Sequence, residues 1–223
     1  MHSSPDNLSV GQSTRLPVVR YDSPTFAGFT VTTAWGNDDI WDAKLNYKGD
    51  IGEFALLGQV GYAQNTTEGS TKCSDSDNAG FRADCRWWGA AGTIMHKPTG
   101  LYVYGGYAKE QNNSRALVAV AGSAVDDDDT SWYIQTGLEH KWIDLGKTTV
   151  FGEYRHDDWG SNPDLRTSGA ATTTANFVAR SDLDFWAGGV VQSIDAAAMD
   201  LYMIYRHADG DVLAGNANTK IQF

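Results

Sequence analysis

Charged and amide side chains recur at every second position of several short segments, and such a row can act on a hydrated solute. In an extended strand alternate side chains point to the same face, so each row would line one side of a sheet. Fixed charges along a polar wall attract, repel or orient the ions and small molecules that pass it. The wall-facing candidates are Arg20, Lys44, Lys48, Gln59, Gln135, Glu139, Lys141, Glu153, Arg155, Asp200 and Arg206.

Three arginines of this set, Arg20, Arg155 and Arg206, are predicted to matter most. A cationic row facing acidic groups across a pore would produce a transverse field. The alternative for each arginine is an ion-paired or solvated side chain without effect on selectivity. Because the longer connections are acidic, a slight preference for cations is expected.

Cys73 and Cys85, the only two cysteines, lie in a polar, glycine-containing segment. A metal or redox pair is disfavoured, since there is neither Cys-x-x-Cys spacing nor a neighbouring histidine. The pattern favours a disulfide in an oxidising compartment, which for a ring of this size contributes about 3 kcal/mol.

The acidic run Asp126–Asp129 invites a divalent-cation interpretation, because calcium sites are rich in oxygen. A solvated charge run in a loop is the more common reason for such a sequence. His156 and His207 have neither metal-ligand spacing nor a third ligand candidate. No phosphate-binding glycine loop and no nucleophile elbow is present. We therefore assign no metal, no cofactor and no catalytic residue.

The elements that would position the wall residues are strands, and the segment 132–142 shows this best. One face is apolar with an aromatic at each end, and the other face is mostly polar. This is the pattern of a strand with lipid on one side and water on the other. The first face is Trp132, Ile134, Thr136, Leu138, His140 and Trp142, and the second is Tyr133, Gln135, Gly137, Glu139 and Lys141.

The whole chain divides into strands of this kind, joined alternately by tight turns and by longer polar segments. After an irregular segment at 1–14, eleven strands are predicted at 15–22, 26–35, 41–48, 53–63, 85–96, 101–109, 131–143, 147–156, 182–194, 198–207 and 212–223. Tight turns are expected at 22–25, 49–52, 97–100, 144–147 and 195–197, and longer connections at 36–40, 64–84, 110–130, 157–181 and 208–211. The predicted fold is an all-β antiparallel meander, a transmembrane β-barrel with about 11–12 strands in residues 15–223.

Composition agrees with this fold. The chain has 223 residues with 24 glycines and 5 prolines, which suits sheet with many bends. Without a run of about 18 apolar residues a transmembrane helix is excluded, whereas a barrel strand needs only about 10 residues with every second one apolar. The net charge of −11 argues against nucleic acid as a partner.

Strand parity leads to an expectation about completeness. If the last strand ends on the tight-turn side, the strand at 15–22 begins on the long-loop side. A bacterial barrel with an even number of strands begins and ends on the same side. We therefore expect an odd number of further strands upstream, or a contribution from residues 1–14. The opening residues also lack the apolar core of a signal peptide.

Several segments resemble a known family. Residues Val19–Phe29 resemble the strand–turn–strand unit of Gram-negative general porins. Segments Trp35–Ala43, Ile94–Tyr107, Gly152–Asp158 and Lys220–Phe223 resemble the alphaproteobacterial branch of that family, as do the paired cysteines. The resemblance implies a sixteen-stranded, usually homotrimeric, water-filled barrel amid outer-membrane lipid and lipopolysaccharide that passes small hydrophilic solutes. This chain would then lack the signal sequence, about five strands and the inward-folded third loop.

Three alternatives remain open at this point. The first is an outer-membrane barrel enzyme with His156, Asp157 and Asp158 at the loop rim. The second is a soluble antiparallel β-protein that binds carbohydrate through surface Trp and Tyr. The third is a truncated product without a stable closed state, since open strand edges are unfavourable, or a smaller barrel of about 12 strands.

Overall fold

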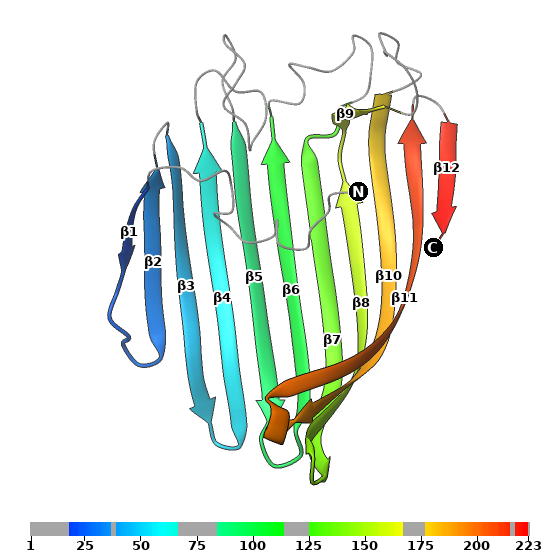
Figure 1. The fold of residues 1–223 in the computed structure, drawn as a ribbon. Coiled ribbons are helices and arrows are strands. Elements are labelled where there is room, and N and C mark those ends of the chain that lie inside the picture. The colour runs from blue at the N-terminus through cyan, green and yellow to red at the C-terminus, as the bar shows by residue number, and fades with distance from the viewer. Residues whose placement is uncertain are drawn as a thin grey trace.

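The protein is a single curved sheet in a computed structural model that describes residues 18–36, 39–66, 84–113, 125–166, 177–214 and 217–222 (Figure 1). Its only helical element in these ranges is a 3-10 turn, Asp195–Ala197. None of the described helical structure is long and apolar enough to cross a membrane. The strands are β1 Val18–Asp22, β2 Phe29–Gly36, β3 Ile40–Ile51, β4 Phe54–Asn65, β5 Cys85–His96, β6 Leu101–Asn112, β7 Asp128–Ile143, β8 Gly146–Trp159, β9 Asn162–Arg166, β10 Phe177–Ile194, β11 Met199–Ala214 and β12 Ala217–Gln222.

Sequential strands pair with one another and always antiparallel, so the predicted all-β meander is confirmed. The order runs β1 to β8 and then β10, β11, β12, while short β9 leaves this path and pairs with β10. Among the described residues β1 pairs only with β2 and β12 only with β11, so the sheet is open at these edges. Both edge strands run toward the same end (Figure 1).

The tight turns expected from the sequence all lie at one end of the sheet (Figure 1). Gly52, with a φ of +58°, allows the chain to reverse between β3 and β4. The first hairpin turns at Ala27 and Gly28, both with positive φ, as the mirror-image turns favoured in hairpins require. The turn expected at 22–25 is therefore displaced, and the Ser23 N–H still donates to the Val31 carbonyl of the facing strand.

Two predicted connections prove to be strand in large part. Residues 208–211 continue β11, where Asp209, Gly210 and Asp211 pair with β10 on one side and β12 on the other. The chain reverses only between Ala214 and Ala217, so the strand predicted at 212–223 is wrong in its first part. Within 157–181, β8 continues to Trp159 and β10 begins at Phe177. Gly and Asp mark turns by propensity, and here pairing on both sides overrides it.

The sheet has no dry core among its described residues. The buried hydrophobic side chains there are only Ala63, Cys85, Val178 and Ala208. Larger apolar side chains are exposed instead, for example Ile134 at 48%. A water-soluble sheet would cover such residues with a second layer. The structure therefore presents its hydrophobic side chains outward from a single layer.

Candidate functional site: a two-faced wall with a polar groove

The pairing register gathers most of the large apolar side chains on one side of the sheet, here called the apolar face, with exceptions such as Leu57 and Phe151 on the other side. Val31 lies opposite Leu45, which lies opposite Val60. Farther along the sheet, Leu138 lies opposite Val150, and both lie on this same face. Because these partners are side by side on neighbouring strands, the face is a continuous apolar band.

Aromatic rings border this band at both ends. In the described chain, eight of the nine close ring pairs lie on the apolar face. Toward the long loops these pairs are Trp41–Tyr62, Trp88–Tyr107, Trp132–Tyr154, Trp132–His156 and Tyr154–Trp186, and toward the tight turns Phe29–Tyr47, Phe54–His96 and His140–Trp142. On β4 the two girdles are Phe54 and Tyr62, about 27 Å apart along the strand. Along a strand tilted by about 40° this spacing spans roughly 21 Å of the membrane, close to the apolar band of about 25 Å found on outer-membrane barrels.

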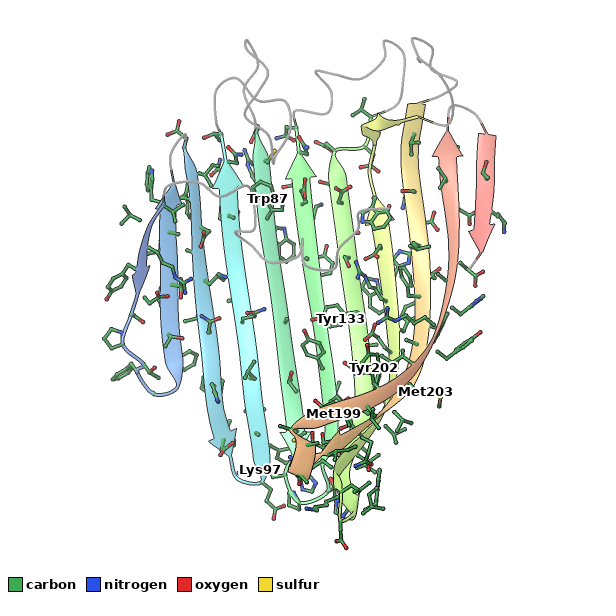
Figure 2. The ribbon with its side chains drawn as sticks, viewed as in Figure 1. Trp87, Lys97, Tyr133, Met199, Tyr202 and Met203 are labelled. Carbon is green, nitrogen blue, oxygen red and sulfur yellow. The ribbon has the colours of Figure 1, made fainter. Side chains whose placement is uncertain are left out.

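The predicted wall residues share the opposite side, here called the polar face. Register links them directly, as where Gln135 lies opposite Glu153, Glu153 opposite Ala187, and Ala187 opposite Arg206. Lys141 lies at an irregularity between His140 and Ile143. The others on this face are Arg20, Lys44, Lys48, Gln59, Glu139, Arg155 and Asp200. Figure 2 shows the rings of Trp87 and Tyr133 on this same side, toward which β11 curves.

Two hollows lie on the polar face, which is therefore the concave one. The first, here called the polar groove, has a volume of about 390 Å³ and brings together Lys44, Gln59, Glu153 and Arg155 from β3, β4 and β8. The second, of about 710 Å³, lies nearer the tight turns and includes Lys48. Four of the predicted wall residues thus line one groove, although they are far apart in sequence.

A buried carboxylate anchors one end of the polar groove. Asp157 is only 1% exposed, accepts a hydrogen bond of 2.5 Å from the Ser131 hydroxyl and lies 2.8 Å from Arg155 Nε. The Arg155 guanidinium also lies 5.9 Å from the centre of the Phe185 ring. These contacts fix the cation against the wall and balance its charge, so Arg155 contributes little net charge to the groove.

The other predicted wall residues lie outside this groove, and several have close partners. Arg20 pairs with Asp22 at 2.8 Å, Glu139 with Lys147 at 2.5 Å, and Lys141 with Asp195 at 3.4 Å. Gln135 donates a 3.3 Å hydrogen bond to the Tyr102 hydroxyl. Arg20, Arg155 and Arg206 lie on β1, β8 and β11, so they do not form a row on neighbouring strands.

The residues of the hypothetical enzyme site do not face one another. His156 and Asp158 lie on the apolar face, whereas Asp157 between them lies on the polar face. His156 Nδ1 lies 2.8 Å from Asp184 Oδ1, and Asp158 pairs with Arg180. The alternative of a catalytic trio is therefore not supported, because strand alternation separates its members across the wall.

The acidic run 126–129 is not simply a solvated loop. Asp128 and Asp129 begin β7, and Asp128 forms a 2.6 Å ion pair with Lys109. Asp129 accepts a hydrogen bond of 2.7 Å from the Gly160 N–H. No group of three acidic, His or Cys side chains in the described ranges is arranged to hold a metal ion.

Cys85 is fully buried at the first position of β5, and Cys73 lies outside the described residues. The disulfide thus stays a prediction. We expect the intact mass of the refolded, unreduced protein to be about 2 Da below that of the reduced chain, since closing the bond removes two hydrogens. Cys85→Ser should abolish the difference. Equal masses for the unreduced and reduced protein would contradict the bond.

Sequence reasoning missed the aromatic part of the groove. Tyr104 and Tyr133 line it, with ring centres 5.0 Å apart. Alternation puts Tyr133 on the polar side of its strand. A single tyrosine on that side does not by itself indicate a binding site. The signal that could have found Tyr133 is Gly106 on the neighbouring strand. That Gly106 lies directly opposite Tyr133 becomes known only from the pairing register.

Comparison with known proteins shows the fold. No family model matches the chain, and no curated protein sequence does. A BenF-like porin from Pseudomonas fluorescens Pf-5 aligns with a TM-score of 0.55 and 14% identity, over 95% of this chain and 56% of the porin. OmpT, an outer membrane protein of Vibrio cholerae, aligns with a TM-score of 0.48 and 14% identity, over 92% of this chain and 59% of that one. The chain has the fold of part of an outer-membrane β-barrel and spans little more than half the length of these proteins.

Proposed function

We propose that this chain forms most of the wall of a water-filled pore in the outer membrane, through which small hydrophilic solutes and ions diffuse passively. The observation that carries this proposal is the two-faced wall. An apolar band between aromatic girdles suits lipid, and a concave polar face with open hollows suits water. The soluble carbohydrate-binding alternative lacks support, because the apolar face is exposed along the described strands.

We infer that strands in addition to those described complete the barrel. Edge strands β1 and β12 run in the same direction (Figure 1). Direct pairing between them would be parallel, whereas an odd number of intervening strands gives an antiparallel ring throughout. This supports closure by further chain, as the resemblance to sixteen-stranded porins of the alphaproteobacterial branch implies. Assembly as a homotrimer and contact with lipopolysaccharide belong to the same proposal.

Reconstitution into planar lipid bilayers tests the pore directly. We expect stepwise current increments proportional to voltage, because a water-filled channel without a gate behaves as a resistor. The protein should first be shown to be folded by the mobility difference between heated and unheated samples on a gel. Folded protein that gives no steps, in samples where a known porin does, would overturn the proposal.

Charge selectivity should depend on the Asp157 carboxylate. The open pore is expected to prefer cations slightly, as read from the reversal potential in a salt gradient. Asp157→Asn should shift that potential toward anions, because Arg155 then keeps an unbalanced positive charge facing the lumen. Asp158→Asn is the matched control, since its side chain lies on the apolar face and should leave the reversal potential unchanged. Equal shifts in the two variants would contradict the assignment.

A further inference from the structure

We propose that the polar groove is a weak binding site for the ring of a neutral sugar. This inference rests on the proposed function, because the groove lies on the face assigned to the lumen. It names a solute class that the wall would hold during passage. The site is built from three neighbouring rows of residues that cross the sheet from β3 to β8.

The first element of the site is a tyrosine ring that lies against a glycine of the neighbouring strand. Tyr133 lies directly opposite Gly106, and a Cβ at Gly106 would come within 2.9 Å of that ring. The glycine therefore leaves the space that the ring occupies, and Tyr133 lines the hollow. Tyr104 stands next to it, tilted by 56°. An aromatic face is electron-rich, so it attracts the weakly positive C–H groups on one side of a sugar ring.

The second element is the base of the groove, which is formed by residues with very small side chains. Lys44 lies opposite Gly61, Gly61 opposite Gly89, and Gly89 opposite Ala108. This row separates the Lys44 side chain from the tyrosines by strands whose side chains are hydrogen or methyl. The space above this base belongs to a groove of about 390 Å³, within the range of about 300–1,000 Å³ typical of small-molecule sites.

The third element is a set of polar groups that are available to a ligand. Lys44, Gln59 and Glu153 line the groove, and within the described ranges none of them has a hydrogen bond or ion pair. Glu153 lies one strand away from Tyr133 and can accept hydrogen bonds from the hydroxyl groups of a ring stacked there. Lys44 and Gln59 lie three or more strands away and supply donors and acceptors at the far side of the groove. Lys44 and Glu153 carry opposite charges and Arg155 is balanced by Asp157, so the groove has little net charge. A neutral polyol therefore fits better than an anion or a cation.

Affinity should be low. The groove is open to the lumen, and a pore must release what it binds. We therefore expect saturation in the millimolar range, which corresponds to about 4 kcal/mol of binding free energy.

Saturation-transfer NMR on the refolded full chain in detergent, with methyl α-D-glucopyranoside as the probe, tests the site. Tyr133→Ala should raise the dissociation constant about tenfold, because ring stacking is lost. Tyr133→Phe keeps the ring and should stay within about twofold. Tyr202→Ala is the matched control, since Tyr202 lies on the polar face outside the groove and is 74% exposed (Figure 2).

Three outcomes would overturn the site. The first is the absence of a saturable signal from folded protein. The second is an equal affinity for glycerol, which has hydroxyls but no ring. The third is an unchanged dissociation constant in Tyr133→Ala. The result is separable from the pore proposal. Sugar binding by protein that never conducts would support the sugar site and contradict the pore. Conductance without saturable binding would contradict the sugar site alone.

Discussion

Replacing Val150 by lysine is expected to destabilise the membrane-inserted protein by about 2–4 kcal/mol, the usual cost of a cation on the lipid side of a barrel near the bilayer midplane. Val150 is 44% exposed on the apolar face, with Leu138 and Val190 beside it on the neighbouring strands. It lies midway along β8 between the girdle residue Tyr154 and the turn at Gly146. A charge there has neither water nor a counter-ion.

Thr149→Lys is the matched control for this substitution. Thr149 is the preceding residue, so its side chain lies on the polar face, and Glu139 lies directly opposite it. The same lysine should therefore cost less than about 1 kcal/mol. Urea unfolding of both variants in phospholipid vesicles, followed by tryptophan fluorescence, measures the difference. A larger loss for Thr149→Lys would reverse the assignment of the two faces.

Gly100→Ala is expected to prevent folding altogether. Gly100 ends the turn between β5 and β6 with a φ of +73°, and a Cβ there would lie 1.7 Å from the Glu139 carbonyl oxygen. The obstacle is backbone rather than a movable side chain, and the Glu139 N–H also donates to the Gly100 carbonyl at 3.0 Å. Strand β7 could only be accommodated by breaking its pairing with β6 at this end.

Gly52→Ala separates the clash from the backbone conformation. Gly52 has a similar φ of +58°, yet a Cβ there meets nothing within 4 Å. We expect this variant to fold with a loss of about 1–2 kcal/mol, the cost of a left-handed conformation for a residue with a Cβ. Gel mobility before and after heating reports folding of both variants. Normal folding of Gly100→Ala would show that the β5–β6 turn does not pack against β7 as described.

Most strands could be predicted because each one shows the alternation of apolar and polar residues within its own segment. The segment 132–142 alternates without interruption, and β7 contains it. Turns were harder, since Gly and Asp occur in strands as well as in turns. Residues 208–211 combine both types and continue β11, because partners on β10 and β12 satisfy their backbone groups. Ser23 and Pro24 likewise precede the actual reversal at Ala27 and Gly28.

The candidate site was predictable only as a set of residues. Alternation placed Lys44, Gln59, Glu153 and Arg155 on the polar side of their own strands, and the register agrees. It could not show that these four share a groove while Arg20 and Arg206 lie elsewhere. The Asp157 contact with Arg155 was also out of reach, because a pattern of alternation contains no information on ion pairing.

The sequence by itself determined which side of each strand is apolar, because side chains alternate between the two faces of a strand and each segment keeps its own alternation. Only the tertiary structure decided which strands lie side by side and at what offset. That offset puts the Tyr133 ring over Gly106 and aligns the aromatics into two girdles. The physical reason is that hydrogen bonds between backbones are the same for every residue, so they do not select an offset. The offset is selected by turn geometry and by the match of apolar side chains across neighbouring strands, which exist only once the strands are paired.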